Sequence, residues 1–509
     1  MRTKKFIYNS VSSGILQIFT LLGGLILPRL YITTYGSEIN GLVNSVVQFV
    51  SYFSYVEAGL GVALIYALYK PLAEKDQSRI NGIASLAKKS YIKASIIYLL
   101  LVICFSFVYP FIVASEMVDN ITIFMLVFVI GISGALDFYT LAKYKVLLTA
   151  DQKEYIISLV SIIAYFINFV ITCALILHEY NIVIVRLAPL VTYFLKSFLL
   201  YLYVKRKYSF LRYNFPYDTI HLQRRWDALL LQLSVSLNLS VPIVIVSIFC
   251  SLKMASVYSI YSMIFVGLIG IISVFTSGVT ASFGNIVANK EYKVLGKVHS
   301  QFELSIFAIT GFLYACTLIL INSFISIYTQ GVTDINYLNP TYGILFVVWG
   351  ILHNIRIPYT ALVNANGLYR ETRKVNILQI LILIVLSIIL VQFFQIIGVL
   401  IALIVAALYR GIDLILVVHR LVLKTSLYKT FMRIILMFVI VVASYLPFYF
   451  WININATSLY GWFVQAIGVA IWCCFVTILV SFLIDRKGLK GIINRLVQII
   501  PHNVLLKRK

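Results

Sequence analysis

Residues 375–394 read VNILQILILIVLSIILVQFF, a largely apolar run with no charged side chain. A helix of roughly 20 such residues crosses the roughly 30 Å hydrocarbon core of a bilayer. Similar runs recur along the chain of 509 residues, of which 61% are hydrophobic and 12% charged. A water-soluble domain could not cover so much apolar surface with so few charges. The sequence therefore predicts an all-α membrane protein.

The apolar runs predict about 14 transmembrane helices. Each run is roughly twice as long as a barrel strand, and lipid offers no partner for unpaired backbone groups, so helices are expected rather than strands. The expected spans cover residues 10–34, 41–69, 91–114, 121–142, 155–178, 182–204, 228–251, 255–288, 302–325, 341–365, 375–394, 397–419, 430–451 and 460–484.

The basic residues lie mainly in short loops between these runs. The chain has 41 lysines and arginines against 18 acids, which gives a net charge of +23. Most of the basic residues precede the first span or follow an even-numbered span, and the positive-inside rule then places both termini in the cytoplasm. Because this placement follows the topology, the positive charge does not indicate a nucleic-acid partner.

Short segments recur at one spacing along the chain. LLTADQKEY (147–155) is similar to LVNANGLYR (362–370), so that Ala150 and Ala365 are 215 residues apart. Lys75 and Lys290 share that spacing, and Lys196 and Arg410 are 214 apart. The spacing covers six spans, so the two halves should have the same orientation and be related by a pseudo-two-fold axis along the membrane normal.

This repeat predicts two parallel-related six-helix bundles and two extra C-terminal helices. The expected domains are residues 1–214, residues 215–425, two additional spans in 426–485, and a basic amphipathic cytoplasmic tail in 486–509. Two such bundles can rock about a central path and open it to each side in turn, as transporters do. In the tail, one helical face is apolar, and we expect it to lie on the anionic inner leaflet.

One arginine lies near the middle of the tenth span. The stretch WGILHNIRIPYTAL (349–362) contains Arg356, and His353 lies one turn earlier on the same face. An arginine at mid-bilayer costs on the order of 2.5–3.5 kcal/mol, so Arg356 should face the bundle interior. There it would either pair with an acid such as Glu57 or line a wet cavity.

Two further arginines have acids close in sequence. Arg410 has Asp413 three residues later, and Arg186 has Glu179 within two turns. Pairing within one helix is therefore the competing interpretation for both residues, and a purely stabilising role for all the buried arginines stays open.

The remaining buried charges are two basic residues and two acids. Arg29 follows Pro28 near one end of the first span, and Lys196 lies in the sixth; each could instead extend its side chain to the interface. Glu57 and Asp137 could neutralise arginines or carry a coupling ion, H+ or Na+. The basic groups outnumber the acids, which predicts a cationic cavity and an anionic passenger.

Three stretches together resemble a known family. SSGILQIFTLLGGLILPRLYITTYGSEINGL (12–42), FSYVEAGLG (53–61) and LLTADQKEY (147–155) are similar to the polysaccharide-transporter branch of the multidrug/oligosaccharidyl-lipid/polysaccharide exporter (MOP) superfamily, the Wzx-type flippases of O-units and capsule repeat units. The resemblance implies a protein of the bacterial cytoplasmic (inner) membrane that moves an undecaprenyl-diphosphate-linked oligosaccharide to the outer leaflet. Arg29 sits where related flippases carry a basic residue.

The resemblance also implies partners for this protein. Membrane lipids, the polyprenyl-diphosphate-linked oligosaccharide, and polysaccharide polymerase and assembly proteins are the candidate partners. The chain has 35 tyrosines, whose rings suit sugars, and arginines suit phosphates. We find no catalytic or metal-binding constellation, and so expect neither an enzyme nor a cofactor.

Two alternatives remain at this stage. The first is a cation-coupled drug antiporter of the same superfamily, which would favour a cavity dominated by acids. The second is a membrane glycosyl polymerase or ligase, which would need a large outer loop with catalytic groups. The longest outer loop expected here, residues 326–340, has no lysine, arginine or histidine.

Overall fold

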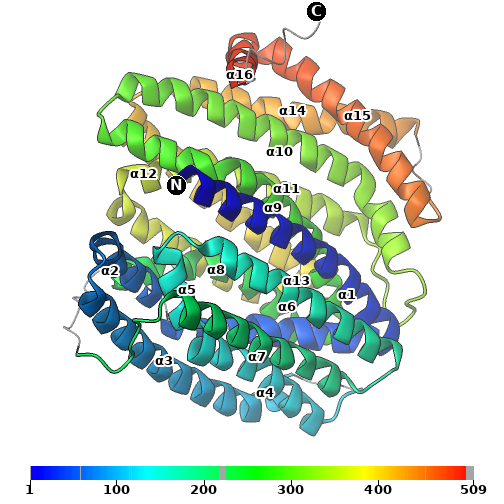
Figure 1. The fold of residues 1–509 in the computed structure, drawn as a ribbon. Coiled ribbons are helices and arrows are strands. Elements are labelled where there is room, and N and C mark those ends of the chain that lie inside the picture. The colour runs from blue at the N-terminus through cyan, green and yellow to red at the C-terminus, as the bar shows by residue number, and fades with distance from the viewer. Residues whose placement is uncertain are drawn as a thin grey trace, which may run out of the picture. The chain divides into compact units, whose positions relative to one another are not determined.

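A computed structural model describes residues 2–57, 59–113, 115, 117–216, 225–452, 454 and 456–499, and this part of the chain is helical with no strand (Figure 1). The elements are α1 (Arg2–Phe53), η1 (Ser54–Glu57), α2 (Leu60–Glu74), α3 (Gln77–Ile112), α4 (Asn120–Leu136), η2 (Asp137–Leu141), α5 (Ala142–Ala150), α6 (Glu154–Leu177), α7 (Ile182–Lys207), α8 (Arg225–Phe249), α9 (Leu252–Ala288), α10 (Tyr292–Tyr328), α11 (Pro340–Ile355), α12 (Ile357–Asn366), α13 (Tyr369–Val418), η3 (His419–Leu423), α14 (Tyr428–Phe450), α15 (Leu459–Ile484) and α16 (Arg486–Ile499).

The expected spans fall largely on helices, although the second one, 41–69, includes the end of α1 and the start of α2; the predicted all-α class is confirmed. Within the described residues, 11 helical stretches are long and apolar enough to cross a membrane. The stretch Val11–Glu57 contains residues 11–34 of the first expected span and residues 41–57 of the second, and the stretch Glu371–Leu423 contains two expected spans. In each stretch the backbone leaves the helical region between the spans, at Gly36 (φ 82°) and at Gln395 (φ 50°) respectively. At the first junction the Asp334 carboxylate accepts hydrogen bonds from the Ser37 backbone N–H (2.8 Å) and hydroxyl (2.7 Å).

The chain divides into two compact units. Unit 1 contains residues 1–260 and 331–335, and unit 2 contains residues 261–330 and 336–509. In unit 1, α8 packs on α1, where Ser45 and Ser247 share a hydroxyl hydrogen bond of 2.7 Å. The division therefore lies later in the chain than 214/215, and the predicted repeat boundary at that position stays a prediction.

The same unusual backbone conformations recur in both halves of the sequence. Positive φ angles occur in three pairs of residues that are 215 or 216 apart: Lys75 (58°) and Lys290 (58°), Gln152 (57°) and Gly367 (67°), and Glu179 (56°) and Gln395 (50°). Residues with a side chain rarely adopt this conformation, so its recurrence at one spacing favours an internal repeat.

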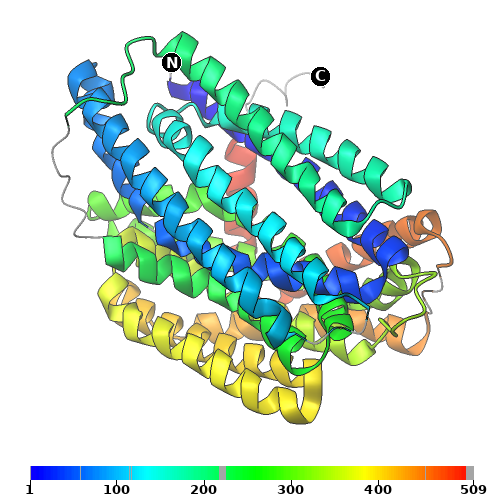
Figure 2. The same cartoon turned by 90° about the horizontal axis from the view of Figure 1, so that it is seen from below.

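Each unit packs a tyrosine against a helical glycine at matching positions. Tyr98 of α3 lies on Gly134 of α4, and Tyr314 of α10 lies on Gly350 of α11. The two tyrosines are 216 positions apart in the sequence, and so are the two glycines. Figures 1 and 2 both show α3 and α4 side by side. A methyl group at either glycine would overlap the facing ring, so these contacts set how closely the helices approach.

Gly350→Ala is therefore expected to lower the free energy of unfolding by about 1–3 kcal/mol through overpacking against Tyr314. The matched control is Gly468→Ala in α15, where nothing lies within 4 Å of the added carbon. That change should leave stability equal or raise it by up to about 1 kcal/mol. Unfolding by denaturing detergent measures both, and equal stability of the two variants would contradict the close-approach explanation.

The C-terminal helices pack on α10 within unit 2. α14 and α15 run beside α10 (Figure 1), and their contact is a cluster of Leu304, Leu436, Ile440, Val476 and Val480. Ile492 of α16 packs against this cluster. The placement of the tail's apolar face on the inner leaflet stays a prediction, and at Ile492 the protein itself supplies an apolar partner. Residues 500–509 of the predicted tail lie outside the described residues.

Candidate functional site

The expected tenth span is broken at Arg356. Pro358 has no backbone N–H, so it cannot donate to the Asn354 carbonyl, and the helix ends at Ile355 and restarts at Ile357. The restarted helix α12 is held by the Thr360 N–H donating to the Arg356 carbonyl at 2.9 Å. In transporters, discontinuous helices expose backbone and side-chain polar groups to substrates at membrane depth.

Two guanidinium groups lie near one another at this break. The Arg356 Nη2 donates to the His353 ring at 2.9 Å, and Arg356 lies close enough to Arg410 for their charges to repel. Arg410 is only 6% exposed and binds Asp413 through an Nη1–Oδ2 contact of 3.1 Å. Among the described residues of unit 2, Arg356 has no ion pair, so this cluster holds two arginines against one carboxylate.

Unit 1 interrupts its matching span in a different way. Between α4 and α5, the π-helical turn η2 begins at Asp137, the residue 216 positions before His353. The Lys145 ammonium donates to the two Asp137 oxygens at 2.7 and 2.8 Å. Short π-helical turns inside α-helices are frequent at functional sites, because they turn side chains out of the regular register.

Two cavities in unit 1 adjoin this ion pair, since Asp137 and Lys145 line both. The smaller cavity, about 190 Å³, also contains Glu57, whose carboxylate accepts a hydrogen bond of 3.3 Å from the Tyr91 hydroxyl. The larger cavity, about 470 Å³, also contains Lys196. Lys196 therefore lines a cavity, where it adds a second ammonium beside one carboxylate.

The two remaining predicted arginines are both in unit 1. The Arg186 guanidinium lies 4.4 Å from the centroid of the Tyr31 ring, and no ion pair with Glu179 is found among the described residues. Its Nε is buried without a hydrogen-bond partner. Arg29 is half-buried in α1, and its side chain has no ion pair in the described part of the chain. The predicted pairing of Arg186 within its helix is therefore replaced by stacking on an aromatic face.

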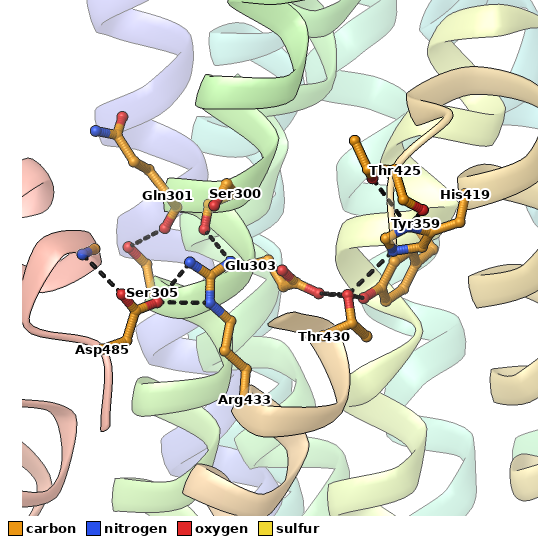
Figure 3. A network of polar contacts seen from close by, with 11 residues as sticks. Ser300, Gln301, Glu303, Ser305, Tyr359, His419, Thr425, Thr430, Arg433 and Asp485 are labelled. Atoms are coloured by element: carbon orange, nitrogen blue, oxygen red, sulfur yellow. Dashed lines mark hydrogen bonds and ion pairs between the residues drawn. The ribbon is translucent and has the colours of Figure 1, made fainter. Parts of the chain in front are cut away.

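A buried ion-pair network of unit 2 was not predicted from the sequence. Figure 3 shows Arg433 of α14 between Glu303 of α10 and Asp485, the residue between α15 and α16. Arg433 Nη1 lies 2.6 Å from Glu303 Oε2, and Nη2 lies 2.6 Å from Asp485 Oδ2. Arg433 is 4% exposed and Glu303 2%. One guanidinium therefore ties the last two spans to the rest of unit 2.

The network continues on the other side of Glu303 (Figure 3). The hydroxyls of Tyr359 and Thr430 both donate to Glu303 Oε1, the latter at 2.8 Å. Thr430 also contacts the His419 ring at 3.1 Å. The signal that could have identified this network was Glu303, a carboxylate inside an expected span, since such a group needs a buried partner.

No metal-binding group of three or more His, Cys, Asp or Glu residues occurs in the part of the chain that the structure describes. The clusters above offer hydrogen-bonding groups and charges to ions or polar groups. They contain ion pairs, aromatic faces and cavities.

No family model matches the sequence, and no curated protein matches it. Solved structures do match it. The lipid II flippase MurJ in an inward closed conformation superposes with a TM-score of 0.66 at 15% identity, covering 94% of this chain and 99% of its own. An inward-facing multidrug resistance MATE family transporter of the MOP superfamily gives a TM-score of 0.65 at 14% identity, covering 83% and 95%. The protein has the MOP superfamily transporter fold.

A third structure with the MOP fold is a transporter from Pyrococcus furiosus whose binding pocket is described as having reverse polarity. It matches with a TM-score of 0.53 at 15% identity, covering 83% of this chain and 97% of its own. The three proteins thus share one fold while their descriptions differ in substrate and pocket charge. For this MOP-fold protein, the passenger has to be inferred from its own side chains.

Within the MOP fold, the predicted site residues separate into two clusters. Unit 2 brings together Arg356, His353, Arg410 and Asp413. In unit 1, Glu57 and Asp137 line one cavity together with Lys145, whereas Arg186 and Arg29 lie in other surroundings. Their assignment to substrate or ion binding stays a prediction.

Proposed function

We propose that this protein moves polyprenyl-diphosphate-linked polysaccharide repeat units from the cytoplasmic to the outer leaflet of a bacterial cytoplasmic membrane by alternating access. The observation that carries the proposal is the pair of arginines, Arg356 and Arg410, at the broken helix of unit 2. With Asp413 as the only carboxylate in ion-pair contact among the described residues of that cluster, a positive charge remains for an anionic passenger.

An arginine cluster suits a diphosphate passenger better than it suits a cationic drug. Each guanidinium presents a planar set of donors that matches two phosphate oxygens, and such charge-assisted hydrogen bonds are short and strong. His353 holds the Arg356 side chain through its ring nitrogen, which reduces the conformational freedom lost when a phosphate binds. The fold is similar to that of a multidrug resistance transporter and to that of a lipid II flippase, so the fold fits either kind of passenger. The two arginines favour the lipid-linked passenger.

A drug antiporter is the second candidate, and the acids of unit 1 are the observation in its favour. Glu57 and Asp137 line adjoining cavities that a cation could enter. Asp137, however, is already neutralised by Lys145, and Lys196 adds further positive charge nearby. The balance of charge in unit 1 therefore disfavours a cationic passenger, and leaves Glu57 as the group for a coupling proton.

Glu57→Gln is expected to abolish the response of transport to an imposed pH gradient. Glutamine keeps the acceptor for the Tyr91 hydroxyl but cannot bind and release a proton. The measurement is flipping by the purified protein in vesicles with and without a pH gradient. Glu371→Gln, at an exposed acid at the start of α13, is the control that should respond as the unchanged protein does. A normal response of the Glu57 variant would exclude Glu57 as the coupling group.

The proposed function is tested by reconstitution. Vesicles containing the protein and a fluorescent undecaprenyl-diphosphate-linked oligosaccharide should lose inner-leaflet fluorophore to a membrane-impermeant quencher faster than protein-free vesicles. A parallel assay measures uptake of cationic dyes. Uptake of dyes without flipping of the lipid would support the antiporter and contradict the flippase.

A further inference from the structure

Polar side chains form one stripe along α6 in unit 1. Beyond the first turn of this apolar helix, the polar residues are three or four positions apart: Ser158, Ser161, Tyr165, Asn168 and Thr172. Residues at this spacing share one face of a helix. Polar groups in a transmembrane helix face a neighbouring helix or a cavity, because lipid offers them no partner. The stripe therefore marks the side of α6 that turns away from lipid.

One member of the stripe joins two helices, and three line a cavity. The Ser158 hydroxyl shares a hydrogen bond of 3.3 Å with Ser13 of α1. Ser161, Tyr165 and Asn168 line the larger cavity of unit 1, about 470 Å³, together with residues of α1 and α7. Ser161 and Asn168 form no side-chain hydrogen bond with the described part of the chain, and Asn168 Oδ1 is buried. Helix packing therefore accounts for Ser158, whereas Ser161 and Asn168 offer their polar groups to a molecule in the cavity.

Another wall of this cavity comes from α7. Pro189, Thr192, Tyr193 and Lys196 line it at helical spacing. The Thr192 hydroxyl is used within the helix, where it donates to the Pro189 carbonyl at 2.8 Å. With Tyr165 of α6, the cavity has two aromatic rings, and its volume lies within the roughly 300–1,000 Å³ of small-molecule sites. Aromatic faces beside free amide and hydroxyl groups suit a sugar, whose ring has apolar faces and whose edge carries hydroxyls.

The charges at this cavity leave one ammonium without a partner. The Lys145 ammonium binds both oxygens of Asp137, and these two residues are the charged groups of the described chain that act on Lys196. Lys196 itself forms no ion pair with a described residue. Glu57 lines the adjoining smaller cavity and is not among the residues that line this one. Because an unpaired charge at membrane depth is costly, Lys196 indicates a site for an anionic group.

We propose that this cavity, the Lys196 pocket, binds a sugar that carries a carboxylate, such as a hexuronic acid, in the oligosaccharide of the passenger. The Lys196 ammonium binds the carboxylate, and Ser161 and Asn168 bind sugar hydroxyls. One ammonium matches the single charge of a carboxylate, whereas a diphosphate calls for the paired guanidinium groups found at Arg356 and Arg410. The inference rests on the proposed function, because the sugar reaches the pocket as part of the lipid-linked passenger.

The test compares two lipids that differ at one sugar: undecaprenyl diphosphate linked to a disaccharide that ends in glucose or in glucuronic acid. The full chain in nanodiscs should bind the glucuronic acid lipid about tenfold more tightly, as expected for one charged hydrogen bond. Lys196→Met keeps the length of the side chain and should remove this preference without changing the affinity for the glucose lipid. The control is Lys205→Met, at an exposed lysine of the same helix, which should keep the preference.

Asn168→Leu separates sugar binding from general attraction to a positive charge. The substitution removes an acceptor that has no partner in the described chain, so the affinity for both lipids should fall several-fold while thermal stability is kept or rises. Unchanged affinity of this variant for both lipids would overturn the proposal, and so would a preference that survives Lys196→Met.

Flipping of the same two lipids in vesicles separates this inference from the proposed function. Equal affinity of the unchanged protein for the two lipids, with both lipids flipped, would overturn the Lys196 pocket and leave the flippase intact. A preference for the glucuronic acid lipid that Lys196→Met removes, with neither lipid flipped, would support the pocket and contradict the flippase.

Discussion

Arg433→Ala is expected to lower the free energy of unfolding by about 3–5 kcal/mol, the largest stability effect of any single substitution considered for this protein. The change leaves Glu303, which is 2% exposed, without its guanidinium partner. It also releases Asp485, which precedes α16, so the last helix should lose its fixed position. Unfolding by denaturing detergent, followed by circular dichroism, measures the effect.

Two controls define the cause of that loss. Arg420→Ala removes an exposed arginine from the neighbouring turn η3 and should change stability by less than about 0.5 kcal/mol. The double variant Glu303→Leu/Arg433→Met removes both charges and should recover much of the stability, because no charge is left buried and unpaired. If the double variant were as unstable as Arg433→Ala, packing rather than the unpaired charge would be responsible.

Arg356→Ala is expected to reduce flipping of a diphosphate-linked lipid by about tenfold to a hundredfold, the range for losing a charged hydrogen bond to a phosphate. Stability should fall little or rise, because the neighbouring Arg410 is relieved of a like charge. The measurement is restoration of surface polysaccharide in a flippase-deficient strain at matched protein level, together with flipping in vesicles.

Arg356→Lys separates charge from geometry at the same position. Lysine keeps the positive charge but not the planar set of donors, so partial activity, between that of alanine and arginine, is expected. Full activity of the alanine variant would remove Arg356 from the binding site.

Much of the fold could be predicted because bilayer burial leaves a strong signal. Runs such as 375–394 are long, apolar and bounded by charge, and α13 covers this run. The junctions within α1 and α13 fall in the expected loops, because residues 35–40 contain Gly36 and residues 395–396 contain Gln395. At Gly36 the backbone leaves the helical region (φ 82°) and the chain kinks, and α1 continues on both sides of this residue.

The site could be predicted only residue by residue. Arg356 was conspicuous because a charge inside an apolar run is costly, and Pro358 two residues later explains the helix break at this position. The partners of such residues were not predictable. Glu303 and Arg433 are 130 residues apart, and Asp137 reaches Lys145 because of a π-helical turn, so neither pair follows from helical spacing.

The most direct test of the central claim, that the Arg356–Arg410 cluster binds the passenger's diphosphate, is an affinity comparison in nanodiscs. The account predicts that the unchanged protein binds undecaprenyl diphosphate at least about tenfold more tightly than undecaprenol, and that Arg356→Ala removes this preference without weakening the binding of undecaprenol. Equal affinity of the unchanged protein for both lipids, or a preference that survives Arg356→Ala, would contradict it.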